Sequence, residues 1–137
     1  MSRHRALGLA ALLSLTGCLS PTGPKLYSSM TASLLTAPAT GPTVARIGDV
    51  VRIHWWIDVG DRCHYFRAQA EASHDTLVAT VVAEQRAEAC LIEGARYQYT
   101  ITVTGVSPAV DVLRLVYDWP GSPPYATTAL EVPLGPS

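Results

Sequence analysis

Three histidines recur at intervals of ten residues, at His54, His64 and His74. A zinc site needs three or four such ligands, each about 2 Å from one metal ion. Ten residues is also a common repeat for adjacent strands of a β-sheet protein, so this spacing allows the histidines to converge but does not require it. We therefore predict neither a metal site nor a cofactor for this chain.

The tripeptide Ser73-His74-Asp75 holds the three residue types of a hydrolase triad in consecutive positions. A triad is defined by a nucleophile, a base and an orienting carboxylate that meet in space, whereas consecutive residues of a turn point in different directions. Serine and aspartate are also ordinary turn-forming residues. The tripeptide therefore predicts a turn and not an active site.

Two acidic pairs are also too sparse to carry chemistry. Asp58 and Asp61 flank Gly60, but calcium needs six to eight oxygen ligands and no acidic cluster follows them. Glu84 and Glu88 lie in no context that would separate a general acid from a general base. We therefore expect that the chain is not an enzyme.

Aromatic side chains are the better candidates for binding. If residues 50–58 (VVRIHWWID) alternate as a strand does, Trp55 faces the core and Trp56 faces outward. Trp119 and Tyr125 occupy a proline-rich segment, WPGSPPY. Exposed Trp and Tyr can stack on sugars or anchor a protein partner, so Trp56, Trp119 and Tyr125 are candidate binding residues. The alternative is that Trp56 lies inside, under a second sheet or a loop.

The segments that must position these residues alternate between apolar and polar with period two, which indicates β-strands. In residues 97–105 (YQYTITVTG) the outward positions are mostly threonines, as in an antiparallel strand with one face in solvent. Turn-forming residues separate the segments. Besides residues 50–58 and 97–105, strands are expected over residues 63–70, 76–84, 109–118 and 127–134, and the first strand over residues 33–38 or 43–47.

About seven short strands, spaced roughly 10 to 15 residues apart and joined by turns, predict an all-β, antiparallel β-sandwich. At the level of architecture the pattern resembles immunoglobulin-like domains, although the Cys-Trp-Cys order of antibody domains is not kept. A small β-barrel is the alternative. Residues 83–95 are the least regular stretch and fit either a short helical turn or a loop.

The beginning of the chain differs in character from the rest. Basic residues at positions 3 to 5 precede an almost wholly apolar run over residues 6–15, and two small residues follow. This order of a basic region, a short apolar region and small residues is typical of a secretory signal peptide. The apolar run is too short to span a bilayer as a permanent helix.

The next residues, Leu15-Thr16-Gly17-Cys18, resemble the lipobox of bacterial lipoproteins. The resemblance implies cleavage before Cys18, diacylglycerol on its sulfur, and a fatty acyl chain such as palmitate on the new amino terminus. Two or three acyl chains hold a protein at a bilayer durably, whereas one anchors it only marginally. The next residue is Leu19, where an Asp commonly retains such proteins at the inner membrane, so the resemblance implies the outer membrane if the cell is Gram-negative.

The cysteine count fits the same interpretation. If Cys18 carries lipid, Cys63 and Cys90 remain as a pair in an oxidising compartment, where a disulfide is the default. The closed loop would hold 28 residues, and the chain-entropy model gives about 3.5 kcal/mol of stabilisation for that length. Two buried free cysteines are the alternative.

The predicted organisation has four parts. They are a cleaved signal peptide over residues 1–17, the lipidated cysteine with a flexible tether over 18–32, the sandwich over 33–134 and a tail over 135–137. Cleavage leaves 120 of 137 residues and removes two of the ten basic residues but none of the eleven acidic ones, so the net charge moves from −1 to about −3. A nucleic-acid partner, which needs a concentrated basic face, is therefore not expected.

These observations together predict a lipoprotein of the cell envelope that contacts the membrane through its lipid. Its role is expected to be that of a protein-binding or scaffolding module. A carbohydrate-binding module that uses the exposed aromatic residues is the alternative, and an enzyme with an unrecognised site is the least favoured reading.

Overall fold

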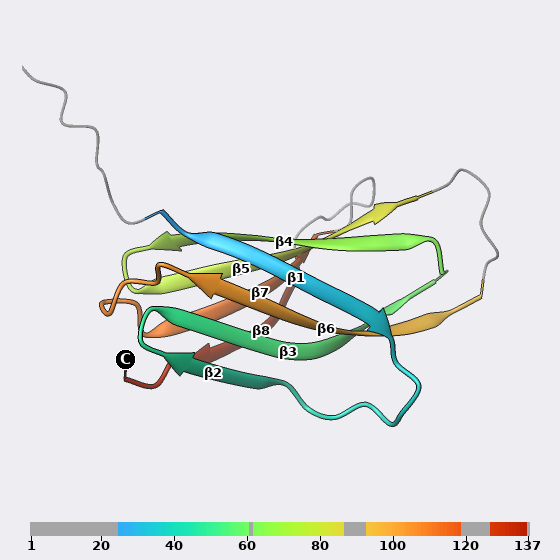
Figure 1. The fold of residues 1–137 in the computed structure, drawn as a ribbon, viewed down its shortest axis with the longest axis horizontal. Coiled ribbons are helices and arrows are strands. Elements are labelled where there is room, and N and C mark those ends of the chain that lie inside the picture. Colours follow the sequence, from blue (N-terminus) through green and yellow to red (C-terminus); the bar gives the residue numbers. More distant parts are fainter. Residues whose placement is uncertain (1–24, 61, 87–92, 119–126, 137) are drawn as a thin grey trace, which may run out of the picture.

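The computed structural model describes residues 25–60, 62–86, 93–118 and 127–136 (Figure 1). These residues form eight strands in two four-stranded sheets. The first sheet has the order β1-β6-β3-β2 and the second the order β4-β5-β7-β8. The strands are β1 (Tyr27–Leu34), β2 (Thr43–Ile47), β3 (Val50–Val59), β4 (His64–Ser73), β5 (Thr76–Gln85), β6 (Ala95–Thr104), β7 (Val112–Asp118) and β8 (Thr127–Pro133).

The all-β class and the two packed sheets agree with the predicted sandwich. The alternative of a small barrel is wrong, because the described strands form two separate sheets and do not close on themselves. A wholly antiparallel arrangement is also wrong, since β5 and β7 pair in parallel while the other five pairs are antiparallel. The chain leaves β5, runs back through β6 in the opposite sheet, and so enters β7 in the direction of β5.

The first strand begins earlier than expected. β1 covers six residues, 27–32, that were expected to belong to the tether, and it pairs with β6 along its whole length. Its sequence, YSSMTASL, carries few apolar residues because only Met30 and its inward neighbours must pack against the core. Of the candidate first strand over residues 33–38, only 33 and 34 belong to β1 and residues 35–38 are irregular, whereas residues 43–47, the other candidate, form the second strand, β2.

The core lies between the sheets and follows the period-two pattern. The predicted inward residues of β3 and β6 are buried, with Trp55 and Tyr97 partly buried at the margin of the core. The second sheet supplies the facing layer, mainly from β5 and β7. The buried residues at the centre of this core include Val51, Ile53, Ile57, Leu77, Ala79, Val81, Tyr99, Ile101, Val103, Leu113 and Leu115.

Two tyrosines join the sheets inside this core. The hydroxyls of Tyr99 on β6 and Tyr117 on β7 lie 2.8 Å apart, and the Tyr117 hydroxyl donates to the backbone oxygen of Trp56 at 3.0 Å. Burial, and then the hydrogen bond to Tyr117, raises the pKa of Tyr99 far above its usual value. Burial also raises the pKa of Tyr117. Both phenols therefore stay neutral in the folded protein.

One end of the sandwich, which we call the Lys25 end, is closed by backbone contacts. The start of β1, which follows Lys25, and the end of β8 both lie at this end (Figure 1). Gly105 has a positive φ of 83°, and a Cβ there would lie 2.6 Å from the Lys25 oxygen. Arg46 on β2 donates from Nη2 to the Ser107 oxygen at 2.8 Å and from Nη1 to the Val110 oxygen. The loop between β6 and β7 is thereby tied to β2 and to the start of β1.

Candidate functional site

The outer face of the first sheet gathers polar side chains into rows that cross the strands. The register places His54 opposite Thr100 and Trp56 opposite Gln98, and β1 adds Thr31 beside Thr100. Residues two apart on a strand share a face, so these side chains all point away from the core. Strands β1, β6 and β3 thus build one surface from hydroxyl, amide, imidazole and indole groups.

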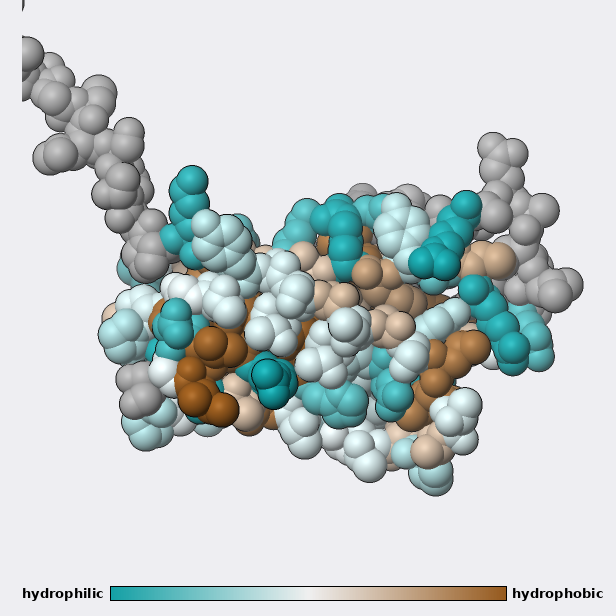
Figure 2. All heavy atoms as spheres, viewed as in Figure 1, coloured by the Kyte–Doolittle hydropathy of each residue, from teal (hydrophilic) through white to brown (hydrophobic). Residues whose placement is uncertain are grey.

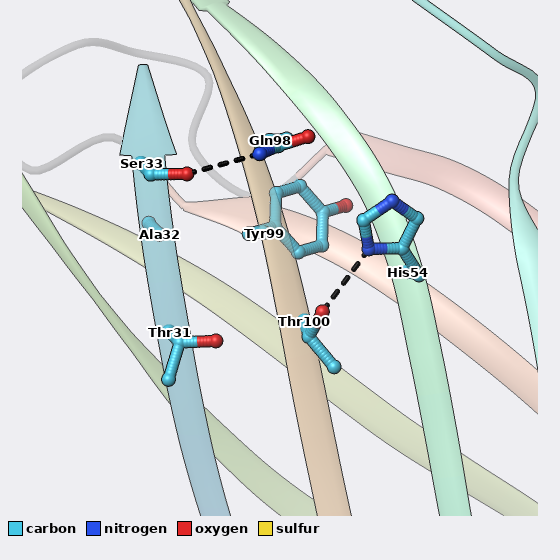
Figure 3. A pocket seen from close by; sticks show the side chains of 7 residues that line it. All are labelled: Thr31, Ala32, Ser33, His54, Gln98, Tyr99 and Thr100. Atoms are coloured by element: carbon cyan, nitrogen blue, oxygen red, sulfur yellow. Dashed lines mark hydrogen bonds between the residues drawn. The ribbon is translucent and has the colours of Figure 1, made fainter. Parts of the chain in front are cut away.

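Two adjoining depressions lie on this surface, and we call them together the sheet groove. The first has a volume of about 170 Å³ and lies over β1, β6 and β3 (Figure 3). The second, of about 210 Å³, shares His54 and Gln98 with the first and extends toward the loop after β1. The first is lined by Thr31, Ala32, Ser33, His54, Gln98, Tyr99 and Thr100, and the second adds Leu35, Ala37, Pro38, Thr40, Trp55 and Trp56.

Neighbouring hydrogen bonds hold the polar groups of the groove in place. A nitrogen of His54, Nδ1, lies 3.0 Å from Thr100 Oγ1, and Gln98 Nε2 donates to Ser33 Oγ at 3.1 Å (Figure 3). Among the described residues, Gln98 Oε1 and His54 Nε2 have no further hydrogen-bond partner. Each of these two side chains is therefore oriented by one polar atom and has a second one available at the surface of the groove.

Trp56 forms a wall of the groove. It lies on the outer face, as the alternation predicts, and it is half-buried. Its indole nitrogen donates to the Thr40 oxygen at 3.0 Å, and the Arg96 guanidinium lies 4.3 Å from the centre of its ring. The loop after β1 and the Arg96 side chain thus cover part of the indole, so Trp56 offers a fixed edge and not a bare platform.

The only ion pair that the described residues place beside the groove holds Arg96 over Trp56. Arg96 donates to both carboxylate oxygens of Asp58, at 2.6 and 2.9 Å. The hydrogen bond from Arg96 holds the pKa of Asp58 below its usual value. This charge pair is exposed and neutralises itself, so the groove keeps a largely uncharged lining.

The outer face of the second sheet has a different character. Arg67 contacts Glu84 at 2.6 Å, Tyr65 donates to the same carboxylate, and Arg114 contacts Glu131 at 2.7 Å. The hydrogen bonds from Tyr65 and then Arg67 hold the pKa of Glu84 below its usual value. Such paired charges are typical of a solvated sheet face, and exposed pairs contribute little to stability. The neutral groove is therefore specific to the first sheet.

The structure places the three histidines that suggested a metal site on different elements. His54 lies on β3, His64 begins β4 and His74 occupies the β4–β5 turn. Within the described residues, no group of three or more His, Cys, Asp or Glu side chains could hold a metal ion.

The Ser73-His74-Asp75 tripeptide lies in an exposed turn. Ser73 Oγ lies 3.1 Å from His74 Nδ1, while the Asp75 carboxylate accepts from Thr76 at 3.0 Å. His74 has a positive φ of 55°, which agrees with the predicted turn.

Several predicted site residues lie outside the described residues. They comprise the proposed lipid site with its recognition sequence, one cysteine of the predicted disulfide, and two of the three candidate aromatic residues. Their structural roles therefore stay predictions. These residues are Leu15, Thr16, Gly17, Cys18, Cys90, Trp119 and Tyr125.

Sequence reasoning missed the polar partners of Trp56. It placed Gln98 and Thr100 on an outward face but did not recognise them as site residues. The missing information was the register of β6 against β3, which sets Gln98 beside Trp56, and the position of β1. A signal was present in the sequence, because Thr31 and Ser33 belong to a short run of alternating small polar residues.

The described parts of the chain contain no helix long and apolar enough to cross a membrane. A search for related proteins gives no further assignment. No protein-family model, curated protein or solved structure matches this chain.

Proposed function

We propose that this chain is a lipid-anchored protein of the cell envelope that binds a neutral glycan in the sheet groove. The observation that carries the proposal is the lining of the groove. Hydroxyl, amide and imidazole groups there are held by hydrogen bonds beside an indole edge. Sugars present alternating hydroxyl groups and apolar C–H faces, and these two features match polar groups and an aromatic wall respectively.

The size of the groove supports the same class of ligand. Volumes of about 170 and 210 Å³ correspond to roughly six to seven water molecules each, at about 30 Å³ per molecule. Each depression thus has room for about one sugar ring, and their shared wall at His54 and Gln98 would let one chain occupy both. The groove is shallow, so selectivity would come from hydrogen bonds to neighbouring rings.

The proposed location rests on the resemblance of residues 15–18 to a lipobox. Acylation of Cys18 would hold the domain at the surface of an envelope membrane, where envelope glycans are accessible. Cys18→Ala is expected to release the protein from the membrane fraction and to leave the thermal stability of the domain unchanged. A variant that stays with the membrane would contradict the proposed anchor.

The proposed disulfide fits the strands around it. The Arg86 amide donates to the Cys63 oxygen at 2.7 Å, so the end of β5 lies beside the start of β4. Only four further residues lead from Arg86 to Cys90, and a disulfide requires Cα atoms about 4.4 to 6.8 Å apart. The immunoglobulin-like comparison remains part of this proposal, as a likeness of architecture.

The test of the groove is a binding titration followed by tryptophan fluorescence. The mature, acylated protein in detergent would be titrated with fragments of neutral envelope glycans and with cello-, malto- and chito-oligosaccharides. We expect a saturable change with one of these classes, because Trp55 and Trp56 line the second depression.

Two matched variants locate the binding. Thr31→Arg fills the first depression, while Ser29→Arg adds the same side chain two residues along the same exposed face of β1. Thr31→Arg should weaken binding by about tenfold or more, which corresponds to a loss of about 1.4 kcal/mol. Ser29→Arg should bind as the unaltered chain does. Equal binding by both variants, or no response to any glycan, would refute the proposed ligand and favour a protein partner.

A further inference from the structure

One cross-strand row on the outer face of the first sheet is mostly apolar, with Thr104 between Tyr27 and Val50. Tyr27 lies opposite Thr104, and Ile47 lies opposite Val50. Since Val51 pairs with Val103, Val50 stands beside Thr104 and the row crosses all four strands. We call these four residues the apolar row. Its two outer members are unusually open, with Tyr27 66 % and Ile47 77 % exposed.

The apolar row lies at the Lys25 end of the sandwich. Figure 2 shows hydrophobic side chains at that end of the visible face and a second group at the opposite end, whereas the middle of the face carries mostly side chains of intermediate hydropathy. A shallow apolar depression continues the surface around the edge of the sheet. It is lined by Lys25, Leu26, Tyr27, Ala70, Ala72, Gly105 and Ser107.

The proposed lipid site limits how far this end can move from a bilayer. Lys25 follows Cys18 by seven positions, and seven fully extended residues span at most about 25 Å. The lipid on Cys18 would therefore keep the apolar row within one tether length of the membrane. The opposite end of the sandwich has no such constraint.

We infer that the apolar row rests on the lipid bilayer, with Tyr27 and Ile47 in its interfacial layer. This inference depends on the proposed acylation of Cys18. Tyrosine is favoured at the headgroup level because its ring is apolar and its hydroxyl is polar. Lys25 stands beside the row, where its long side chain can keep the ammonium group in water while its methylene groups cover apolar surface.

The charges at this end indicate which sheet faces the bilayer. Asp49 lies in the β2–β3 turn of the first sheet, while Asp75 and Asp111 lie in turns of the second sheet. The carboxylates of Asp75 and Asp111 favour water, so the second sheet is turned away from the bilayer and the contact is made by the first sheet. Asp49, between Ile47 and Val50, then lies at the level of the polar headgroups. Three acidic residues stand here against two basic ones, Lys25 and Arg46, so the contact gains little from anionic lipids and depends on apolar burial.

This orientation would set the height of the sheet groove. Thr31 lies four residues along β1 from Tyr27, which is about 13 Å at 3.3 Å per residue. The groove would therefore open close to the bilayer surface, where a membrane-linked glycan is within reach.

The experiment measures which end of the domain meets the lipid. Isotope-labelled mature protein would be placed in phosphatidylcholine nanodiscs that contain a small fraction of gadolinium-headgroup lipid. Paramagnetic broadening of backbone amides would be compared between the Lys25 end and the opposite end. We expect strong broadening at Tyr27, Ile47 and Val50, and weak broadening at Leu34 and Tyr65.

A matched pair of double variants tests whether the apolar row causes the broadening at the Lys25 end. Tyr27→Ser with Ile47→Ser removes the exposed apolar groups of the row, while Leu34→Ser with Tyr65→Ser removes exposed groups at the opposite end, where they are 44 % and 37 % exposed. The first pair should reduce the broadening at the Lys25 end to the level that the tether alone gives, and the second pair should leave it unchanged.

Two results would overturn the inference, and intact mass distinguishes them. If the protein carries acyl mass and Tyr27→Ser with Ile47→Ser leaves the broadening at the Lys25 end unchanged, the anchor stands and the bilayer contact is wrong. If the protein carries no acyl mass, the anchor itself fails, and with it the reason for placing this row on lipid.

Discussion

The hydrogen-bonded pair Tyr99 and Tyr117 predicts an unusual order of stabilities. Tyr99 is 1 % exposed, and its hydroxyl reaches the Tyr117 hydroxyl, which donates in turn to the Trp56 oxygen. In this arrangement Tyr117 must accept from Tyr99. Removing the Tyr117 hydroxyl therefore leaves a buried donor without its acceptor, whereas removing the Tyr99 hydroxyl leaves no donor unsatisfied.

The expected changes in the free energy of unfolding follow from this difference between the two hydroxyls. Tyr99→Phe loses one hydrogen bond and should lower the free energy of unfolding by about 1 kcal/mol. Tyr117→Phe loses two hydrogen bonds and leaves the Tyr99 hydroxyl unsatisfied, so we expect a loss of about 2 to 3 kcal/mol. The double variant has no buried hydroxyl and should lose only about 1 to 2 kcal/mol. Tyr99→Phe is thus expected to stabilise the protein when Tyr117 is already Phe.

The assay is urea unfolding of the four proteins in the same detergent, with tryptophan fluorescence and circular dichroism as probes. Tyr65→Phe is the control, because the Tyr65 hydroxyl meets Glu84 at the surface and its removal should change stability little. If Tyr99→Phe destabilises the protein equally in both backgrounds, the two hydroxyls act independently and the inferred direction of the hydrogen bonds is wrong.

Three further perturbations test other parts of the fold. Because the pKa values of both buried tyrosines are raised, the folded state keeps protons that the unfolded chain loses above pH of about 10. The contribution of these tyrosines to the free energy of unfolding should therefore be constant below that pH. Above it, the free energy of unfolding should fall by about 1.4 kcal/mol per pH unit for each tyrosine, and less steeply in the double Phe variant, as alkaline urea titrations would measure. Gly105→Ala should cost more than about 1 kcal/mol in urea unfolding, since its φ is positive and the new Cβ meets the Lys25 oxygen, whereas Gly41→Ala meets no atom and should be neutral. Arg46→Met should lower the free energy of unfolding by about 1 to 3 kcal/mol because it removes the donors to two loop carbonyls. Arg52 is exposed, so Arg52→Met should have little effect in the same urea assay.

The alternation of apolar residues was enough to predict the sandwich and most of its strands. It worked best for β3 and β6, where bulky residues such as Ile53 and Ile101 define the inner face. It failed for β1, because an edge strand with one partner needs few apolar residues. It could not predict the parallel pairing of β5 and β7, since the period of two is the same for both directions of pairing.

The position of the groove depended on contacts between strands that are distant in sequence. Residues 31, 54 and 98 meet only because β6 lies between β1 and β3. A period-two pattern identifies which face a side chain takes, but it contains no information on which strand is its neighbour. The aromatic candidate was therefore predictable from the sequence, whereas its polar partners were not.

The groove itself arises from a mismatch in side-chain length across the first sheet. β6 and β3 contribute Gln98, His54 and Trp56, which rise well above the backbone, while β1 contributes the short side chains Thr31 and Ser33. A hollow forms wherever short side chains of an edge strand stand beside long ones of the central strands. The weakly apolar sequence that hid β1 as a strand is thus the same property that leaves room for a ligand above it.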